Sequence, residues 1–273
     1  MDGREQLRRY LEQRKEAGER ELVLDALNVE DVLKLVGATP RTGGAMTVPP
    51  GADWREVLRS SGASPQAPSG LSVGVADREL FGALATLDSL DAVAAAVASC
   101  TRCPLYSTAT NPVPGQGNPN AGLMIVGEAP GATEDEKGLA FVGAAGQLLT
   151  KILAAVDLKR EDVFICNVLK HRPPGNRNPM PDEVTACRPY LARQFELIKP
   201  KAILALGTFA AQTLLETKLA IGKLRGQLHR YHGVPLIVTY HPAALLRNPS
   251  WKRPTWEDVQ LVRRILDSSI AQP

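Results

Sequence analysis

Four short apolar runs, each followed along the chain by a helix-like stretch, constrain the fold more than any other feature. The runs lie at 123–126, 163–166, 202–206 and 236–239. The helix-like segments lie near 144–156, 181–198, 208–216 and 254–268. Strands that alternate with helices form a parallel sheet covered on both faces. The sequence therefore predicts an α/β fold, with three α/β/α layers around a four-stranded parallel sheet.

The first 76 residues differ from the rest in composition. Residues 5–36 carry apolar positions at helical spacing, which predicts a helical N-terminal extension over 1–37. Residues 38–76 are rich in Pro, Gly, Ser, Thr and Ala, which predicts a flexible linker. The main domain would then span 77–273. The extension is either an arm that binds DNA or an unidentified partner, or a helical pair that docks on the main domain or moves freely.

Charge and hydropathy bound the possible partners and the compartment. A formal net charge of +3 permits nucleic-acid binding but does not argue for it, so any basic surface has to be local. The chain begins without the apolar core of a signal peptide and has no apolar stretch of membrane-spanning length. These features predict a cytoplasmic protein with no membrane partner. In that reducing compartment the four cysteines are expected to bind metal or pack in the core.

Candidate site residues follow directly on three of the four apolar runs. Gly127 and Glu128 follow the first run, Asn167 follows the second, and His241 stands just after the fourth. Ligands bind to parallel sheets at the carboxyl ends of the strands. We therefore expect these side chains to line one site, although a Gly-rich turn or a histidine alone is as often purely structural.

Three loops add groups suited to nucleic acid. Phe141 lies in a Gly-rich segment, where a ring open to a cleft can stack on a base; a core phenylalanine is the ordinary alternative. Residues 170–179 are basic and stiffened by prolines, which suits contact with phosphates. In the segment 241–249, leucines can wedge into a duplex and fill the gap left by a flipped base.

Four motifs, in order, resemble the family 4 uracil-DNA glycosylases, over roughly Leu80 to Asp267. They are Gly-Glu-Ala-Pro-Gly (127–131), Phe-Val-Gly-x-x-Gly-Gln-Leu-Leu (141–149), Asn-Val-x-Lys-x-Arg-Pro-Pro-Gly-Asn-Arg-x-Pro (167–179) and His-Pro-x-x-Leu-Leu-Arg-Asn-Pro (241–249). The resemblance implies a DNA repair hydrolase that acts on DNA containing uracil. It would flip the uracil out and hydrolyse its bond to the sugar, leaving an abasic site.

The resemblance also implies roles for individual residues. Gly127, Phe141 and Asn167 would bind the substrate: Phe141 would stack on the flipped uracil, and the amide of Asn167 would read the polar edge of the base. The residues expected to act in catalysis are Glu128 as the water-activating base, His241 as a donor to the base oxygen, and Asn176 as a second group for positioning water. The residues expected to contact DNA are Arg172, Arg177, Leu245, Leu246 and Arg247.

Family 4 enzymes hold a 4Fe–4S cluster on four cysteines, which implies the same cofactor here. Cys100 and Cys103 match the family's C-x-x-C, and Cys187 matches its fourth ligand. The third ligand position, in the Lys-x-Arg-Pro-Pro segment, is His171. Histidine ligates iron in Rieske centres. The expected ligands are therefore Cys100, Cys103, His171 and Cys187, and the cluster is expected to be structural.

Cys166 is the alternative to His171 as the remaining ligand. It precedes Asn167, and side chains alternate along a strand, so Cys166 faces away from a pocket that Asn167 lines. We expect Cys166 to be a small buried apolar residue. A cluster on three protein ligands, or no cluster, is the other alternative.

Two rival functions fit parts of the sequence. Some members of the superfamily trap DNA covalently through a histidine in an inserted basic loop, or bind uracil-DNA without turnover. The segment 171–179 has the short form without that insert. An iron–sulfur electron carrier would have no use for Glu128, Asn167 and His241 together at strand ends. A hydrolytic enzyme is therefore the favoured interpretation. We also expect it to work as a monomer.

Overall fold

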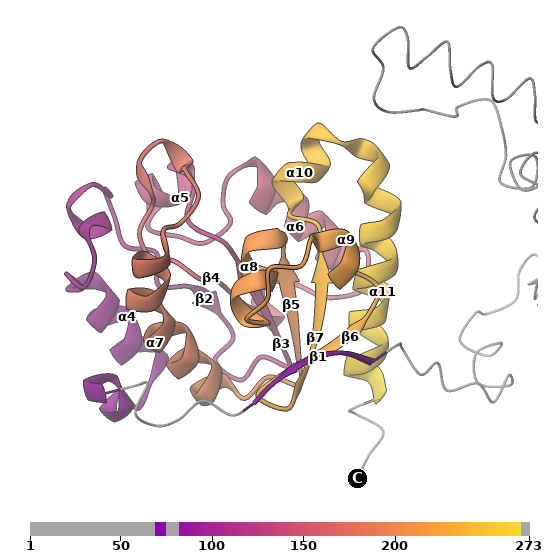
Figure 1. Ribbon diagram of the computed structural model, residues 1–273, viewed down its shortest axis with the longest axis horizontal. Coiled ribbons are helices and arrows are strands. Elements are labelled where there is room, and N and C mark those ends of the chain that lie inside the picture. The colour runs from indigo at the N-terminus through magenta and orange to yellow at the C-terminus, as the bar shows by residue number, and fades with distance from the viewer. Residues whose placement is uncertain (1–68, 75–81, 269–273) are drawn as a thin grey trace, which may run out of the picture. The chain divides into compact units, whose positions relative to one another are not determined.

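A seven-stranded sheet runs through the centre of the fold, in the strand order β1-β6-β7-β5-β3-β4-β2. The structure is a computed structural model that describes residues 69–74 and 82–268 (Figure 1). The four predicted runs are neighbours in this sheet and pair in parallel. They are β3 (Leu123–Gly127), β4 (Phe164–Asn167), β5 (Ala202–Leu206) and β7 (Val234–Thr239).

The predicted four-stranded parallel sheet is wrong in strand number and in direction. Three further strands extend it, namely β1 (Ser69–Val73), β2 (Gln116–Gly117) and β6 (Leu228–Tyr231), of which β1 and β2 form the two edges. Because β2 is antiparallel to β4 and β6 is antiparallel to β7, the sheet is mixed. These three strands were missed because they are short or only half buried, so they carry no continuous apolar run.

Strand β1 also corrects the linker predicted over 38–76. It pairs in parallel with β6, and the Leu71 N–H donates to His229 Nδ1 at 2.8 Å. A Cβ on Gly70 would lie 2.4 Å from that same nitrogen, so a glycine permits this approach. The rest of the predicted linker and the predicted helical extension over 1–37 lie outside the described residues.

All four predicted helices are present, with bounds close to those expected. They are α6 (Ala144–Ala154), α7 (Pro181–Ile198), α8 (Thr208–Leu214) and α11 (Lys252–Ser268). The sequence did not predict the shorter helices α4 (Leu90–Ala98), α5 (Ala132–Lys137), α9 (Ile221–Leu224) and α10 (Pro242–Arg247). Turns of 3₁₀ helix lie at Gly82–Thr86, Pro104–Ser107, Arg160–Asp162, Pro174–Asn176 and Pro249–Trp251, the last labelled η6.

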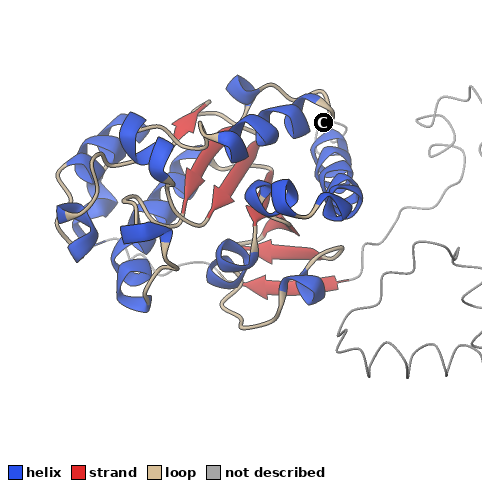
Figure 2. Cartoon of the chain, turned by 90° about the horizontal axis from the view of Figure 1, so that it is seen from above, coloured by secondary structure: helices blue, strands red, loops and turns tan. Residues whose placement is uncertain are grey.

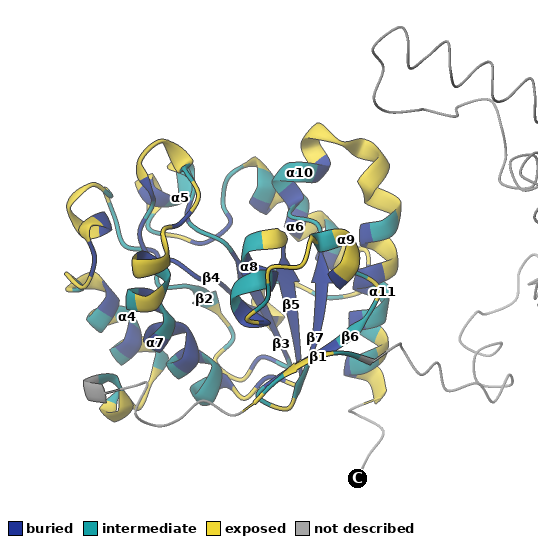
Figure 3. Cartoon of the chain, viewed as in Figure 1, coloured by how far each residue is buried: buried dark blue, intermediate teal, exposed yellow. Residues whose placement is uncertain are grey.

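Helices cover both faces of the sheet, which gives the predicted α/β/α layers (Figure 2). One core cluster joins α6 and α11 to one face, and a second joins α7, α8 and α9 to the other. Strand β4 shows the alternation, because Ile165 lies in the first cluster and Cys166 in the second. The central strands are buried along their whole length (Figure 3). No helix in the described part of the chain is long and apolar enough to cross a membrane.

Candidate active site

A cavity of about 400 Å³ lies beyond the carboxyl ends of β3, β4 and β7. It brings together predicted residues from all four motifs, namely Glu128, Phe141, Asn167, Asn176, Arg177, His241 and Arg247. Glu134 also lines it. The predicted residues Gly127, Arg172, Leu245 and Leu246 are not among the lining residues.

Gly127 lies beneath the cavity, where its lack of a side chain lets two other groups meet. A Cβ there would lie 2.4 Å from Asn167 Oδ1 and 2.5 Å from Phe141 Cζ. Real Cβ atoms do not approach other atoms this closely, so any larger residue would displace one of the two groups. Gly127 therefore shapes the pocket through its absent side chain.

Phe141 is held in place by its backbone as much as by its ring. Its φ of 52° is unusual for a residue other than glycine, and a Cβ on Gly146 would lie 1.8 Å from its carbonyl oxygen. The ring lies 5.5 Å from the imidazole of His241, centroid to centroid, at 34°. With 5% of its surface exposed, Phe141 is both a core residue and a wall of the cavity.

Glu134 holds the segment that carries Phe141, and the sequence did not single it out. One carboxylate oxygen accepts the backbone N–H of Val142 at 2.8 Å and that of Gly143 at 2.7 Å. These bonds join α5 to the start of α6, where a carboxylate is favoured by the helix dipole. In the sequence, this role of Glu134 could have been indicated only by its being an acidic residue among small residues shortly after a predicted strand end.

Asn167 presents an unsatisfied acceptor to the cavity. The residue is 1% exposed, and no group in the described part of the chain donates to its Oδ1. Leaving a buried acceptor unpaired costs about 1–3 kcal/mol. An oxygen kept in this condition at the wall of a cavity is arranged to receive a donor from a ligand.

A buried lysine holds the turn after Asn167, and it too was missed. Lys170 Nζ donates to the Asn167 carbonyl oxygen at 2.8 Å and to Gln194 Oε1 at 2.7 Å. Gln194 in turn donates to the Pro114 carbonyl oxygen at 2.6 Å. A fully buried lysine with two hydrogen bonds of this kind positions the backbone around the residue it touches.

His241 begins α10 and points one ring nitrogen at that helix. Its Nδ1 accepts the Ala243 N–H at 3.2 Å, so in the neutral ring the proton is on Nε2. Burial, and then the nearby Arg247, lower the pKa of His241 to about 4. The ring is therefore neutral at pH 7 and can still donate a hydrogen bond from Nε2.

Glu128 lies at the end of β3, half buried in the wall of the cavity. Burial raises the pKa of its carboxyl group. A carboxylate with a raised pKa is a stronger base at neutral pH than an exposed one. This environment suits the predicted role of Glu128 in activating water.

The arginines of the basic loop 170–179 form hydrogen bonds to other side chains of the protein. Arg177 forms two hydrogen bonds to Glu183, at 2.9 and 2.6 Å. Arg172 donates from Nε to Asn176 Oδ1 at 2.7 Å. Asn176 is left with its amide N–H₂ as the group that can face the cavity.

The leucine prediction is half wrong. Leu245 is 1% exposed and belongs to the packed core, so it cannot wedge into DNA. The segment is helix α10, in which successive side chains point about 100° apart, so Leu246 is 52% exposed instead. Arg247 is exposed beside it and also lines the cavity.

Three of the predicted cluster ligands lie near one another. Burial raises the pKa of Cys103 and raises that of Cys187 to about 11, and Cys100 acts on both thiols through like charge. The thiol of Cys187 also accepts the backbone N–H of Lys170, the residue before His171. His171 is 5% exposed, and its charged neighbour is Asp135. Among the described residues, no three His, Cys, Asp or Glu side chains surround the position of a single metal ion.

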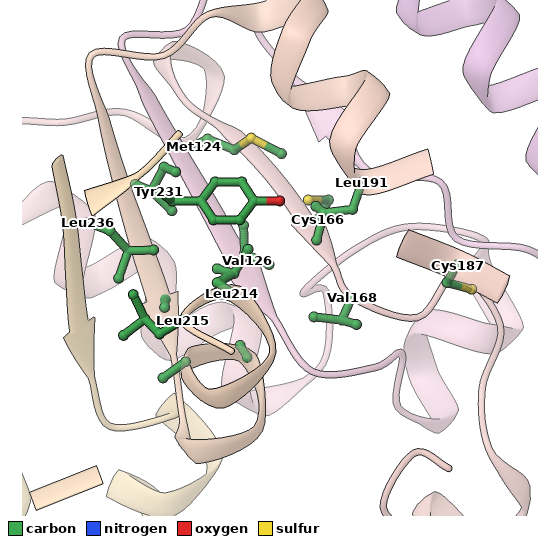
Figure 4. Packing of buried hydrophobic residues seen from close by; sticks show 14 of the residues in the cluster. Met124, Val126, Cys166, Val168, Cys187, Leu191, Leu214, Leu215, Tyr231 and Leu236 are labelled. Atoms are coloured by element: carbon green, nitrogen blue, oxygen red, sulfur yellow. The ribbon is translucent and has the colours of Figure 1, made fainter. Parts of the chain in front are cut away.

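Cys166 is a buried core residue. It is fully buried beside Met124, Leu191 and Tyr231, in the core cluster that also includes Cys103 and Cys187; Figure 4 shows Val168 between Cys166 and Cys187. Burial raises the pKa of the Cys166 thiol. Its packing agrees with the prediction from strand alternation, since Asn167 lines the cavity on the opposite face.

Comparison with known proteins defines the class of this site. Residues 114–260 match the family described as the uracil DNA glycosylase superfamily. The chain therefore belongs to the uracil-DNA glycosylase superfamily, an enzyme family of hydrolases.

Within that superfamily, its relatives include several type-4 uracil-DNA glycosylases, which confirms the predicted family. The chain is 48% identical to the one from Archaeoglobus fulgidus over 171 residues, which cover 60% of this chain and 86% of the relative. It is 45% identical to the one from Sulfurisphaera tokodaii, covering 66% and 86%. A type-5 uracil-DNA glycosylase from Pyrobaculum aerophilum is 34% identical, covering 49% and 66%.

The charge state of His241 can be measured directly. Its pKa of about 4 predicts a ring that is neutral above that pH and takes up a proton only below it. In an NMR titration of the four histidines, one signal should titrate near pH 4 and be absent in His241→Asn. Replacing Arg247 by Gln should raise this pKa, since that guanidinium opposes protonation. A His241 signal that titrates near 6.5 would contradict the assignment.

Proposed function

We propose that the protein binds DNA containing uracil, holds the flipped base in the cavity at the strand ends, and hydrolyses its N-glycosidic bond to leave an abasic site. The observation that carries the proposal is the unpaired Oδ1 of Asn167. The N3–H of uracil is a donor of the kind this oxygen requires, and the amide N–H₂ can donate to the adjacent carbonyl. The names of the type-4 relatives support the same activity.

The same oxygen gives a physical reason for choosing uracil over cytosine. Cytosine presents an unprotonated N3 and an amino group, so its acceptor and donor are reversed relative to uracil. Placed in the same pose, cytosine would set acceptor against acceptor at Asn167 and leave both unsatisfied. Phe141 would cover the face of the base whatever its polar edge, so stacking adds affinity and Asn167 adds selectivity.

Bond cleavage leaves positive character on the sugar and negative charge on the departing base. His241 would donate from Nε2 to the base oxygen as that charge develops. Because its ring is neutral, the donated N–H on Nε2 is its single proton, and the donor carries no charge. Glu128 would activate the attacking water, with the Asn176 amide as a second group to position it.

The exposed side chains around the cavity would bind the DNA strand. Leu246 is the leucine available to fill the gap left by the flipped base, and Arg247 beside it can meet a phosphate. Arg172 and Arg177 remain proposed phosphate contacts. Their bonds to Asn176 and Glu183 reduce the number of donors that each arginine can offer to a phosphate.

We also propose that Cys100, Cys103, His171 and Cys187 hold a 4Fe–4S cluster. The mutual influence of the three thiols supports the cysteine part of this set, and the burial of Cys103 and Cys187 would keep the site dry. Hydrolysis moves no electrons, so the role proposed for the cluster is structural. When bound, it would crosslink the segments that supply these residues. Cys166 is not included, because the thiols of Cys103 and Cys187 interact with Cys100, whereas the charged group that acts on the Cys166 thiol is Lys170.

Replacing Asn167 by Asp tests the reading of the base. A carboxylate only accepts hydrogen bonds, so the ratio of kcat/KM for uracil over cytosine should fall by about 10–100-fold. Release of each base from single-stranded oligonucleotides measures the ratio. Asn120→Asp is the matched control, because Asn120 is exposed and outside the cavity. An unchanged ratio in Asn167→Asp would remove the reading role.

Removing His241 tests the charge-stabilising donor. His241→Ala should lower the single-turnover rate of uracil release by about 10²–10³-fold, the usual loss for one such donor. This change also removes the cap of α10, so His241→Asn, which keeps a capping oxygen, serves with it. If both variants melt like the wild type and His241→Ala keeps a near-normal rate, the role is wrong.

The fourth cluster ligand is decided by two single variants. His171→Ala should lose iron and visible absorption, whereas Cys166→Ala should keep both, because that thiol packs in the core. Iron and sulfide counts per chain, taken with the absorption spectrum, are the measurement. Loss of the cluster in Cys166→Ala with retention in His171→Ala would reverse the assignment.

A further inference from the structure

A second cavity, of about 300 Å³, adjoins the active-site cavity. The two share Glu128, His241 and Ala244, which therefore form a common wall. Beyond that wall the second cavity extends toward α8 and α9, which lie with α10 near the carboxyl ends of β5 and β7 (Figure 1). None of the four sequence motifs predicted a site here.

The outer side of this cavity carries an ordered stack of flat groups. The rings of Tyr240 and Trp251 are 4.4 Å apart, centroid to centroid, and nearly parallel at 16°. The guanidinium of Arg225 lies 4.4 Å from the Tyr240 ring and is held by Asp258 at 2.7 Å. The stack is thus anchored at Arg225, while Trp251 keeps 36% of its surface exposed.

The chemistry of the remaining lining suits a nucleotide. Three uncharged polar side chains, those of Asn178, Thr208 and Gln212, face the cavity together with the Phe209 ring. Glu128 is the one acid among the cavity's described lining residues. Exposed Arg247 and Lys252 flank η6, which carries Trp251. An aromatic platform beside cations is the usual arrangement for binding single-stranded nucleic acid.

The shared wall indicates which nucleotide would enter. In the proposed function, the bond that breaks lies against Glu128 and His241, so the sugar of the flipped uridine has to be near that wall. The strand continues from this sugar in both directions. We propose that the second cavity binds a nucleotide that adjoins the uracil on the same strand, with its base stacked against Trp251. This inference rests on the proposed function and adds a substrate-binding residue to it.

The test removes the neighbouring base from the DNA and the Trp251 ring from the protein. Single-stranded oligonucleotides would carry one uracil, with either the 5′ or the 3′ neighbour replaced by a tetrahydrofuran abasic residue. The kcat/KM for uracil release would be measured for the wild type and for Trp251→Ala on each. Base stacking on an aromatic side chain corresponds to about a tenfold effect or more.

We expect removal of the neighbouring base and removal of the Trp251 ring to abolish the same interaction, so that their effects on kcat/KM do not add. The wild type should lose about tenfold in kcat/KM on one of the two abasic substrates, and Trp251→Ala should lose about tenfold on the intact one. Trp251→Ala should then lose nothing further on that abasic substrate, as in a double-mutant cycle between contacting groups. Equal base-removal effects in the wild type and Trp251→Ala would overturn the proposal, as would no effect of either neighbour.

Matched variants separate this outcome from general damage. Trp256→Ala removes a similarly exposed ring, 39% exposed on α11 and outside both cavities, and should leave kcat/KM unchanged. Trp251→Phe should regain part of the loss and part of the sensitivity to the neighbouring base. Melting curves for each variant exclude unfolding. A wild type that released no uracil from the intact strand would overturn the proposed function, whereas an active wild type indifferent to both neighbours would overturn the subsite alone.

Discussion

The close approach of the Asn167 and Phe141 side chains to Gly127 is the constraint on which the site depends. Strands β3 and β4 pair in parallel with Gly127 opposite Asn167, and a Cβ at 127 would lie 2.4 Å from Asn167 Oδ1. The same absent side chain admits the Phe141 ring, whose backbone Glu134 holds through Val142 and Gly143. The cavity thus follows from sheet register and one missing methyl group, and later loops only complete its walls.

Sequence periodicity predicted the centre of this fold well, because strands buried on both faces have to be apolar throughout. The same reasoning missed the edge strands β1 and β2 and their neighbour β6, which has exposed or polar positions. In the site, the strand-end rule found Glu128, Asn167 and His241, which line the cavity, since their place depends only on where strands stop. It could not separate Leu245 from Leu246, because burial along a short helix depends on what packs against it.

Residues that act by holding others were also beyond the sequence. Lys170 lies between Cys187 and Asn167, because its backbone N–H donates to the Cys187 thiol and its ammonium donates to the Asn167 carbonyl oxygen. Glu183 takes up the charge of Arg177, so the loop is less basic toward DNA than its composition suggests. Such pairings join segments distant in sequence, and no local pattern records them.

The electrostatics of the site are those of a cavity that works with neutral donors. Burial keeps the His241 ring uncharged at pH 7, and the bond from Ala243 leaves its single proton on Nε2. Asn167 would meet the proposed substrate base with an amide whose acceptor has no donor from the described residues. A cationic donor would attract any electron-rich base, whereas a neutral donor and an unpaired acceptor reward only the base whose own pattern is complementary. In the proposed function, selectivity for uracil therefore comes from hydrogen-bond direction, and the positive charge outside the cavity would bind the strand that carries the uracil.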